Sequence, residues 1–200
     1  MRYAIIGFGK IGQALAKAFA RNGIEVSVAT TRDPASFAPE AAAIGPEILP
    51  ATLADALKAD IIFLAVGFRA HADVAKALPD WKGKIIVDVT NAYGVPPEEL
   101  GDQPSSRVVA QAFAGARLVK GFNHLGASVL GRDPAVNGGR RVVFLASDDD
   151  SAAKEIGALA KSLGFAPVEL GGLTEGAPLV EGRGNTWGRL IFQDLVKIDG

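Results

Sequence analysis

The 200-residue chain has no cysteine and only two histidines, His71 and His124. The lack of cysteine excludes disulfides, thiolate nucleophiles, iron–sulfur clusters and cysteine-ligated zinc. Two histidines are too few for a histidine-rich metal site. The chain also lacks an excess of one charge, because 21 basic residues face 22 acidic ones and the net charge is −1. Nothing in this balance favours binding to nucleic acid or to an acidic membrane, and we expect neither as a partner.

Long hydrophobic runs are also missing. No stretch approaches the ~18 unbroken apolar residues of a membrane span, and Gly7 interrupts the N-terminal apolar run well short of a secretion signal. We therefore expect a cytoplasmic protein. The hydrophobic fraction of 48% and the charged fraction of 22% are ordinary for a globular protein. The length suits about one domain with a small appendage.

What the chain does contain is an alternation of short apolar runs with amphipathic segments. The runs suit strands that are buried on both faces, as parallel sheets require; they cover residues 5–6, 26–28, 61–66, 85–87 and 142–145. Apolar residues recur at helical spacing over 11–19 and over 152–163, and Gly164 follows the second stripe as a helix cap. This alternation predicts an α/β fold with a doubly wound parallel sheet.

Glycine and proline interrupt the alternation over 91–106 and 171–186. We expect loops there, the first with room for one short helical turn. The apolar stripe from Trp187 to Leu195 then predicts a final helix over 187–198. This stripe packs either on its own domain or on a second subunit, and we expect a homodimer because homodimers are the commonest oligomers.

The strongest local signal is the segment Gly7-Phe8-Gly9-Lys10-Ile11-Gly12, which follows a predicted strand and opens a predicted helix. In that context the pattern is typical of dinucleotide binding. Gly7 allows a tight turn, Gly9 lets a pyrophosphate approach, and Gly12 lets the helix pack closely on the strand. The free N–H groups and partial positive charge of the helix N-terminus suit the diphosphate.

The choice of dinucleotide is read at the end of the second predicted strand. NAD sites commonly have an acidic residue there, ~20 residues beyond the glycines, which binds the ribose 2′-hydroxyl. This chain has Thr30, Thr31 and Arg32 instead, and hydroxyls beside a guanidinium suit a 2′-phosphate. The residues therefore favour NADP(H) over NAD(H). The alternative is that Arg32 is solvated and Asp33 reaches the ribose.

These signals together predict an NADP-binding Rossmann-type domain over residues 1–120 and a smaller C-terminal α/β lobe over 121–200 that completes the cleft. No linker composition marks the boundary between them. In such a sheet the ligand lies across the C-terminal ends of the strands. Residues that follow each predicted strand are therefore the candidates for the nicotinamide end.

Two further strand ends supply small and polar candidates. Val66 and Gly67 let the backbone approach the cofactor, while Arg69 either contacts a phosphate or faces solvent. Thr90 and Asn91 are suited to bonding the nicotinamide ribose or carboxamide, although both residue types also make turns.

Another predicted strand ends in Phe122-Asn123-His124. An imidazole at that place, neutral or charged, would donate a hydrogen bond to an anion that develops in the reduced acceptor. The alternative is a structural histidine. We expect that structural role for His71, in the first turn of a helix.

Missing motifs narrow the reaction. No Gly-x-Ser-x-Gly elbow supports a hydrolase, and the Ser-x-x-x-Lys and Tyr-x-x-x-Lys pairs of carbonyl reduction are not evident. A hydride transfer that needs little acid–base help fits these residues, because two stacked rings held in proximity account for most of such catalysis.

Several segments together resemble the coenzyme F420-dependent family of NADP oxidoreductases, and the resemblance covers nearly the whole chain. The segments are AIIGFGKIG (4–12), Thr31-Arg32, FLAV (63–66), GKIIVDVTN (83–91), VKGFN (119–123), VFLASDD (143–149) and APVELG (166–171). The glycine motif is shared with many dehydrogenases, whereas the chain length and Phe122-Asn123-His124 are more specific. The family often has proline where this chain has Gly67.

The resemblance implies a Rossmann domain, NADP(H), and hydride exchange with coenzyme F420, a deazaflavin, or with a flavin or similar planar small-molecule acceptor. It assigns Thr31 and Arg32 to the 2′-phosphate. It places Asn91 and His124, the catalytic candidates, in the cleft between nicotinamide and acceptor. Related membrane ferric reductases use a similar nucleotide domain.

Two other functions stay open. One is reduction of an imine or keto acid, as in pyrroline-carboxylate or ketopantoate reductases, but those families append a substantial helical domain and only the predicted helix 187–198 would stand for it here. The other is a non-catalytic NADP(H)-binding sensor, which would keep the glycine turn and Arg32 but show no hydride transfer.

Overall fold

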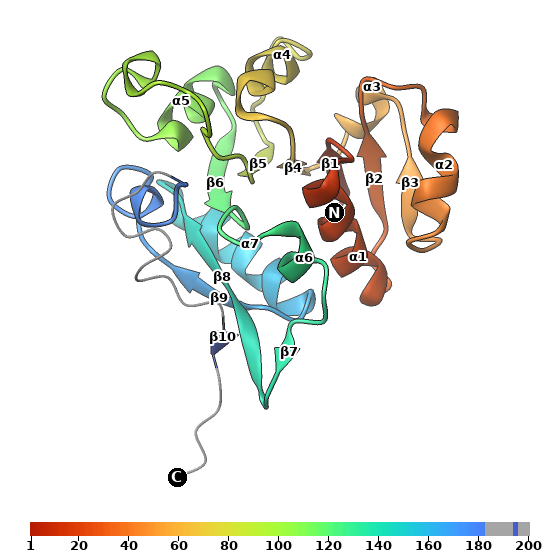
Figure 1. The fold of residues 1–200 in the computed structure, drawn as a ribbon. Coiled ribbons are helices and arrows are strands. Elements are labelled where there is room, and N and C mark those ends of the chain that lie inside the picture. The colour runs from red at the N-terminus through yellow and green to blue at the C-terminus, as the bar shows by residue number, and fades with distance from the viewer. Residues whose placement is uncertain (183–193, 196–200) are drawn as a thin grey trace.

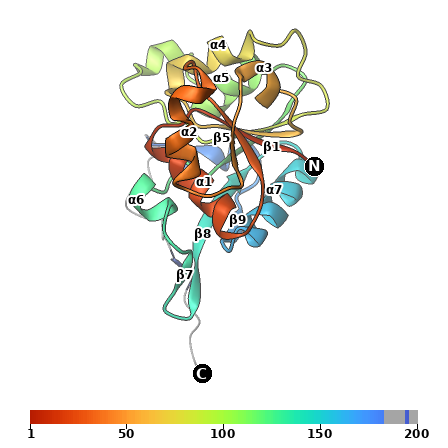
Figure 2. The same cartoon turned by 90° about the vertical axis from the view of Figure 1, so that its right-hand side faces the viewer.

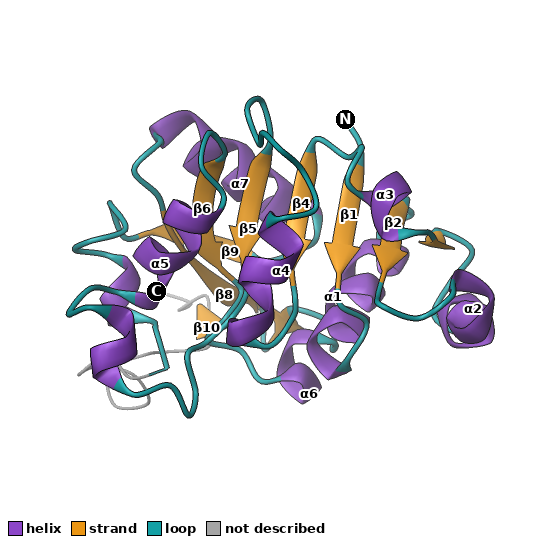
Figure 3. Ribbon diagram, turned by 90° about the horizontal axis from the view of Figure 1, so that it is seen from above, coloured by secondary structure: helices purple, strands orange, loops and turns teal. Residues whose placement is uncertain are grey.

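The computed structural model describes residues 1–182 and 194–195. Its centre is a sheet in which six parallel strands follow the order β3-β2-β1-β4-β5-β6, the strand order of dinucleotide-binding domains (Figure 3). The six strands are β1 (Tyr3–Ile6), β2 (Val26–Ala29), β3 (Ile48–Pro50), β4 (Ile61–Leu64), β5 (Ile85–Asp88) and β6 (Arg117–Gly121). The predicted doubly wound α/β fold is therefore confirmed.

The C-terminal part extends the same sheet. Strand β8 (Gly139–Ala146) runs antiparallel beside β6, and β9 (Ala166–Glu169) runs parallel to β8. A hairpin joins β7 (Ala135–Val136) to β8 and extends away from the rest of the chain (Figures 1 and 2). Its two-residue loop, Asn137-Gly138, has φ angles of 46° and 79°, as tight hairpin turns require.

Helices cover both faces of the sheet. They are α1 (Lys10–Arg21), α2 (Pro34–Ala42), α3 (Leu53–Ala56), α4 (His71–Ala75), α5 (Ser105–Ala112), α6 (Ala127–Leu130) and α7 (Asp150–Ser162), with 3-10 turns at Phe68–Ala70, Pro97–Leu100 and Ala177–Leu179. Aspartates begin two of the helices, because Asp33 caps α2 and Asp149 caps α7 through hydrogen bonds to backbone N–H groups. Gly164, at φ +91°, comes just after Leu163, the C-cap of α7, and ends the helix as the sequence predicts.

Alternate residues of the strands build two cores. Ile5, Phe63 and Val87 point to the face that α1, α2 and α7 cover, whereas Ile62 and Ile86 point to the face of α3, α4 and α5. This two-sided burial explains why the central strands are largely apolar.

The structure corrects four details of the sequence-based prediction. The strand predicted to end in Phe-Asn-His stops at Gly121, because Phe122 turns with φ +61° to place its ring in the core. The loop predicted over 91–106 ends earlier, since α5 begins at Ser105, and it contains a helical turn as expected. Strand β3 and helix α2 carry too weak an apolar pattern to have been predicted.

The fourth detail is the final helix predicted over 187–198. It is wrong at Asp194 and Leu195, which form strand β10 (Asp194–Leu195) against Arg141 and Arg140 of β8. Sheet pairing at the edge of β8 prevails there over the helical spacing. The rest of that prediction lies outside the described residues, and the homodimer inferred from its stripe stays a prediction. The division at residue 120 also stays a prediction.

Over residues 1–182 and 194–195, no helix has the length and hydropathy of a membrane span.

Candidate functional site

The glycine turn between β1 and α1 is fixed by close packing. Gly7 has φ +103°, and a Cβ atom there would lie 2.3 Å from the carbonyl oxygen of Ala65. A Cβ atom at Gly12 would lie 2.0 Å from the carbonyl oxygen of Gly7. Both glycines are therefore required by the fold itself, the first for the turn and the second for the contact of helix with strand.

Gly9 differs from these two glycines because its surroundings are open. A Cβ atom at Gly9 would meet no atom within 4 Å. Gly9 is the N-cap of α1, no side chain caps the helix, and its first turn carries no acidic residue. The N-terminus of α1 therefore presents backbone N–H groups and a positive dipole end toward open space, which suits a diphosphate. Of the two flanking candidates, Lys10 is exposed, whereas the Phe8 ring is buried against Phe37.

The residues after β2 separate the two interpretations of the ribose end. The half-buried Thr30 accepts a hydrogen bond from the backbone N–H of Arg32 at 2.9 Å, and Thr31 is exposed. Asp33 accepts one from the N–H of Ala35 at 2.8 Å and so caps α2. This capping engages one oxygen, Oδ1, of the carboxylate that the NAD alternative assigns to the ribose.

The guanidinium of Arg32 stays within reach of solvent. It lies 5.4 Å above the ring of Phe37, and its Nη2 is 3.5 Å from Oε2 of Glu40. Both partners of this ion pair are about half exposed, and exposed pairs contribute about 0–1 kcal/mol. A phosphate can therefore replace Glu40 as the partner of Arg32 at little cost.

A cavity of about 590 Å³ lies at the C-terminal ends of β4, β5 and β6, beside the first turn of α1. Its walls are largely apolar, with a few polar groups, as is usual for cofactor sites. The cavity brings together six of the predicted site residues, namely Ile11, Val66, Gly67, Thr90, Asn91 and His124.

Arg69 is not among the residues that line this cavity. Its guanidinium donates two hydrogen bonds to the carboxylate of Glu99, at 2.6 and 3.0 Å. The pair joins the turn after β4 to the turn at Pro97–Leu100, and both side chains are exposed. Of the two roles considered from the sequence, the structure therefore shows Arg69 on the surface with an acidic partner.

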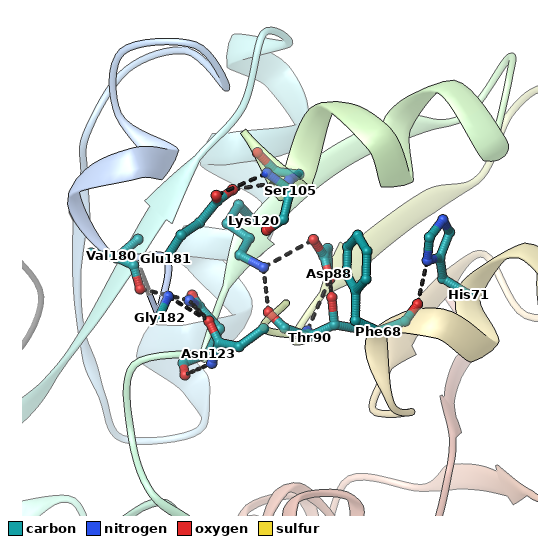
Figure 4. Close-up of polar contacts among 12 residues, drawn as sticks. Phe68, His71, Asp88, Thr90, Ser105, Lys120, Asn123, Val180, Glu181 and Gly182 are labelled. Atoms are coloured by element: carbon teal, nitrogen blue, oxygen red, sulfur yellow. Dashed lines mark hydrogen bonds and ion pairs between the residues drawn. The ribbon is translucent and has the colours of Figure 1, made fainter. Parts of the chain in front are cut away.

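Asn91 ties together the segments around the cavity. Its Nδ2 donates to the carbonyl of Asn123 at 2.8 Å, and its Oδ1 accepts from Asn123 Nδ2 at 3.1 Å and from the N–H of Gly182 at 3.0 Å. Asn123 also donates to the carbonyl of Val180 at 2.8 Å (Figure 4). After these bonds the Asn91 amide retains one N–H for a ligand.

A charged pair that the sequence-based interpretation did not single out lies beneath the cavity. Lys120 Nζ is 3.0 Å from Asp88 Oδ2, and both side chains are completely buried. Lys120 also donates to the carbonyl of Thr90, while Asp88 Oδ1 accepts from the N–H of Thr90 at 2.9 Å and from its hydroxyl at 2.7 Å (Figure 4). The available signal was a lone lysine within an apolar strand, because such a charge needs a buried partner.

His124 is buried in the wall of the cavity. Its ring packs edge-on against Phe144, with centroids 4.9 Å apart, and neither ring nitrogen makes a hydrogen bond of ordinary geometry. Burial lowers the pKa of His124 to about 4, and the nearby backbone of Val142 offsets this only in part. The imidazole is therefore neutral at pH 7, and the charged donor considered from the sequence is not present in the folded chain.

The other histidine has the structural role expected for it. His71 opens α4 and is buried, and its Nδ1 lies against the carbonyl oxygen of Phe68 (Figure 4). Its ring also packs on the Phe68 ring, with centroids 4.8 Å apart.

A second charged group that the sequence-based interpretation did not single out is Glu181, the chain neighbour of Gly182. The buried Glu181 accepts hydrogen bonds from the N–H groups of Ser105 and Ser106, each at 2.9 Å. A carboxylate is thus placed at the N-terminus of α5, where the helix dipole stabilises it. No local pattern indicates this contact, because the partners are 75 and 76 residues apart.

The strand order, the open N-terminus of α1 and the cavity at the strand ends define the class of protein: an NAD(P)-binding oxidoreductase domain. Residues 2–92 of the chain are similar to the coenzyme F420-dependent family of NADP oxidoreductases. The model of that family, "NADP oxidoreductase coenzyme F420-dependent", matches residues 2–92, which hold the glycine turn, Arg32 and the end of β5.

Solved structures of two similar proteins cover most of the chain. The hypothetical protein SMa0349 of Sinorhizobium meliloti is 39% identical, with a TM-score of 0.89, over 99% of this chain and 96% of that one. A candidate F420-dependent NADP-reductase of Arthrobacter sp. FB24 is 29% identical, with a TM-score of 0.70, over 86% of each chain.

Among curated proteins, Metalloreductase STEAP3 of Rattus norvegicus is 30% identical over 176 residues, which is 86% of this chain. Those residues are 34% of that protein, so the chain spans about a third of the length of the curated relatives it matches. An Aspergillus terreus reductive aminase solved with NADPH and ethyl levulinate is 20% identical with a TM-score of 0.65, over 88% of this chain and 56% of that one. At that identity it shows a shared fold alone.

Proposed function

We propose that this chain transfers a hydride between NADP(H) and a planar small-molecule acceptor of the deazaflavin or flavin class, coenzyme F420 among them. The observation that carries the proposal is the cavity at the ends of β4, β5 and β6, which adjoins the open N-terminus of α1. A dinucleotide with its diphosphate at Gly9 would extend its nicotinamide toward this cavity, as ligands do in such sheets.

Selection of NADP(H) is proposed from the residues after β2. Arg32 is accessible and its acidic partner Glu40 is only weakly held, so a 2′-phosphate can take that place. Thr31 is exposed beside it, and Asp33 is engaged as the cap of α2. One oxygen of the Asp33 carboxylate is therefore already committed within the chain.

The walls of the cavity favour a flat, largely apolar acceptor ring. Val66, Val89, Leu125 and Val129 supply aliphatic surface, and the volume is in the usual range for cofactor sites. In the proposed reaction the hydride leaves C4 of NADPH with its electron pair, NADP⁺ forms, and the acceptor ring takes up the hydride. Water supplies any proton that the reduced ring then needs, since the neutral His124 is a poor acid at pH 7.

The two catalytic candidates take modest roles in this proposal. His124 shapes the cavity as a neutral ring packed on Phe144. Asn91 fixes the loops after β5 and β6 and offers one N–H to a ligand. Catalysis then rests mainly on holding two rings in contact, which is sufficient for hydride transfer between them.

The test is NADPH oxidation under anaerobic conditions with a panel of acceptors: a deazaflavin, flavins, a quinone, an imine and a keto acid. We expect turnover with the deazaflavin or a flavin, and its loss in the Gly9→Asp variant, which places a carboxylate in the open diphosphate space. Turnover with the imine or keto acid alone would contradict the proposal. Binding of NADPH without turnover of any acceptor would favour the sensor instead.

A further inference from the structure

The Asp88–Lys120 pair determines whether the hydroxyl of Thr90, a residue that lines the cavity, can donate or accept a hydrogen bond. The carboxylate of Asp88 can only accept hydrogen bonds, and its Oδ1 receives the hydroxyl hydrogen of Thr90 at 2.7 Å. Its other oxygen, Oδ2, is held by the Lys120 ammonium at 3.0 Å. With its hydrogen committed in this way, Thr90 Oγ1 can only accept a hydrogen bond from a ligand.

The orientation of Thr90 is fixed on every side. Its backbone N–H donates to Asp88 at 2.9 Å, and its carbonyl accepts from Lys120. Both charged side chains are completely buried and lie on neighbouring strands, β5 and β6, so neither can turn away without leaving a charge unpaired. Thr90 lines the cavity, and its hydroxyl oxygen is held as a fixed acceptor.

The next residue contributes a complementary group. Asn91 Oδ1 already accepts two hydrogen bonds and Nδ2 donates one, so the amide retains one N–H donor. Thr90 and Asn91 thus offer an acceptor and a donor side by side at the end of β5. A primary carboxamide presents the complementary pair, an NH₂ group and a carbonyl.

We infer that Asp88 and Lys120 are positioning residues that lock the Thr90 hydroxyl as the acceptor for the NH₂ group of the nicotinamide carboxamide. This inference rests on the proposed use of NADP(H). It differs from a purely structural role of the pair, because it predicts recognition of one group at one end of the dinucleotide.

The experiment compares binding of NADP⁺ with binding of 3-acetylpyridine adenine dinucleotide phosphate, in which a methyl group replaces the NH₂ group. Calorimetry on the wild-type chain should show about five-fold weaker binding of the analogue, since one hydrogen bond is worth about 1 kcal/mol. In Thr90→Val, which keeps the shape but removes the hydroxyl, both ligands should bind equally. Thr90→Ser, the matched control, should restore the five-fold difference.

The pair itself is tested by the double variant Asp88→Asn/Lys120→Met, which removes both charges together and so leaves neither alone. We expect the discrimination between the two ligands to fall below two-fold, while the affinity for 2′,5′-ADP, which lacks nicotinamide, stays unchanged. An unchanged 2′,5′-ADP affinity also reports that the variant is folded.

The outcomes separate this inference from the proposed function. The inference fails, and the proposed function stands, if wild type binds 2′,5′-ADP and NADP⁺ but binds the analogue as tightly as NADP⁺. The same holds if Thr90→Val prefers NADP⁺ over the analogue as strongly as wild type does. If the double variant still binds NADP⁺ about five-fold more tightly than the 3-acetylpyridine analogue, Asp88 and Lys120 do not have the positioning role inferred here. If wild type binds none of the three ligands, the proposed function fails together with the inference.

Discussion

The two ends of the proposed cofactor site are built in different ways. At the diphosphate and ribose end, two contacts join residues close in sequence, Gly7 with Gly12 and Asp33 with Ala35, although Gly7 also packs against Ala65. At the nicotinamide end, they join residues far apart, as in Asp88 with Lys120 and Asn91 with Gly182. The first end can therefore be recognised from a short motif, whereas the second exists only once the strands have paired.

The ion pairs at the two ends of the proposed cofactor site also differ. Arg32 and Glu40 form an exposed pair at the ribose end, which a ligand can displace at little cost. Asp88 and Lys120 are completely buried, and removing one would leave the other unpaired in the core. The ribose end is thus suited to exchange partners, and the nicotinamide end to hold one geometry.

The largest expected effect is on stability, and it distinguishes a glycine required for folding, Gly12, from a glycine required for ligand binding, Gly9. Gly12→Ala places a Cβ atom 2.0 Å from the carbonyl oxygen of Gly7, and we expect a loss of more than about 4 kcal/mol in the free energy of unfolding, or no folded protein. The matched control is Gly9→Ala, where no atom lies within 4 Å. It should change thermal stability little and weaken dinucleotide binding. Equal stability of the two variants would contradict this distinction.

The next effect concerns the buried pair. Lys120→Met leaves Asp88 without its cation, and we expect the free energy of unfolding in urea to fall by about 3–5 kcal/mol. The double variant with Asp88→Asn should recover most of that loss, because a neutral pair of similar volume avoids the unpaired charge. Were the double variant as unstable as the single one, the loss would come from packing and not from charge.

The third prediction concerns how stability depends on pH through His124, which lines the cavity at the nicotinamide end. The pKa of His124 is lowered to about 4 in the folded chain, whereas an unfolded histidine has a pKa of ~6.5. Between these values the unfolded chain binds a proton that the folded chain does not, so stability falls as the pH is lowered from ~6.5 toward 4. Integrated over that window, the loss amounts to up to about 3 kcal/mol.

Urea unfolding of wild type and His124→Phe across this pH range checks the third prediction. The variant keeps an aromatic ring against Phe144 but cannot bind the proton. Its stability should decline less steeply with falling pH. Parallel curves for the two proteins would show that His124 titrates alike in both states.

The smallest expected effect lies at the exposed ribose end. Arg32→Ala should weaken NADPH binding by about ten-fold and NADH binding hardly at all, because a charge-assisted hydrogen bond contributes about 1.5 kcal/mol. Glu40→Gln should strengthen NADPH binding by up to about two-fold, since it removes the competing carboxylate. An equal loss for NADPH and NADH in Arg32→Ala would contradict the assignment of Arg32 to the 2′-phosphate.

The sequence was sufficient for much of the fold and for one end of the site. Apolar runs and helical stripes identify β1, β2, β4, β5, β8, α1 and α7, because burial on two faces leaves a continuous pattern. The glycine turn can be recognised from the sequence because its three glycines lie within six residues, at the junction between a strand and a helix. Strand β3, with only three residues and one of them exposed, carries no such pattern.

Much of the nicotinamide end had no local signal. Thr90 and Asn91 can be placed at a strand end from the sequence, but most of their hydrogen-bond partners cannot, since Lys120, Asn123 and Gly182 lie far along the chain. Glu181 caps α5 across 76 residues for the same reason. The neutral state of His124 also follows from burial among distant residues, which a single strand-end motif does not reveal.

The most direct test of the central claim is calorimetric titration of the wild-type chain with NADPH and NADH under identical salt conditions. With the diphosphate at Gly9 and the 2′-phosphate at Arg32, NADPH should bind with measurable heat and at least about ten-fold more tightly than NADH. No heat with either dinucleotide, or equal affinity for both, would contradict it.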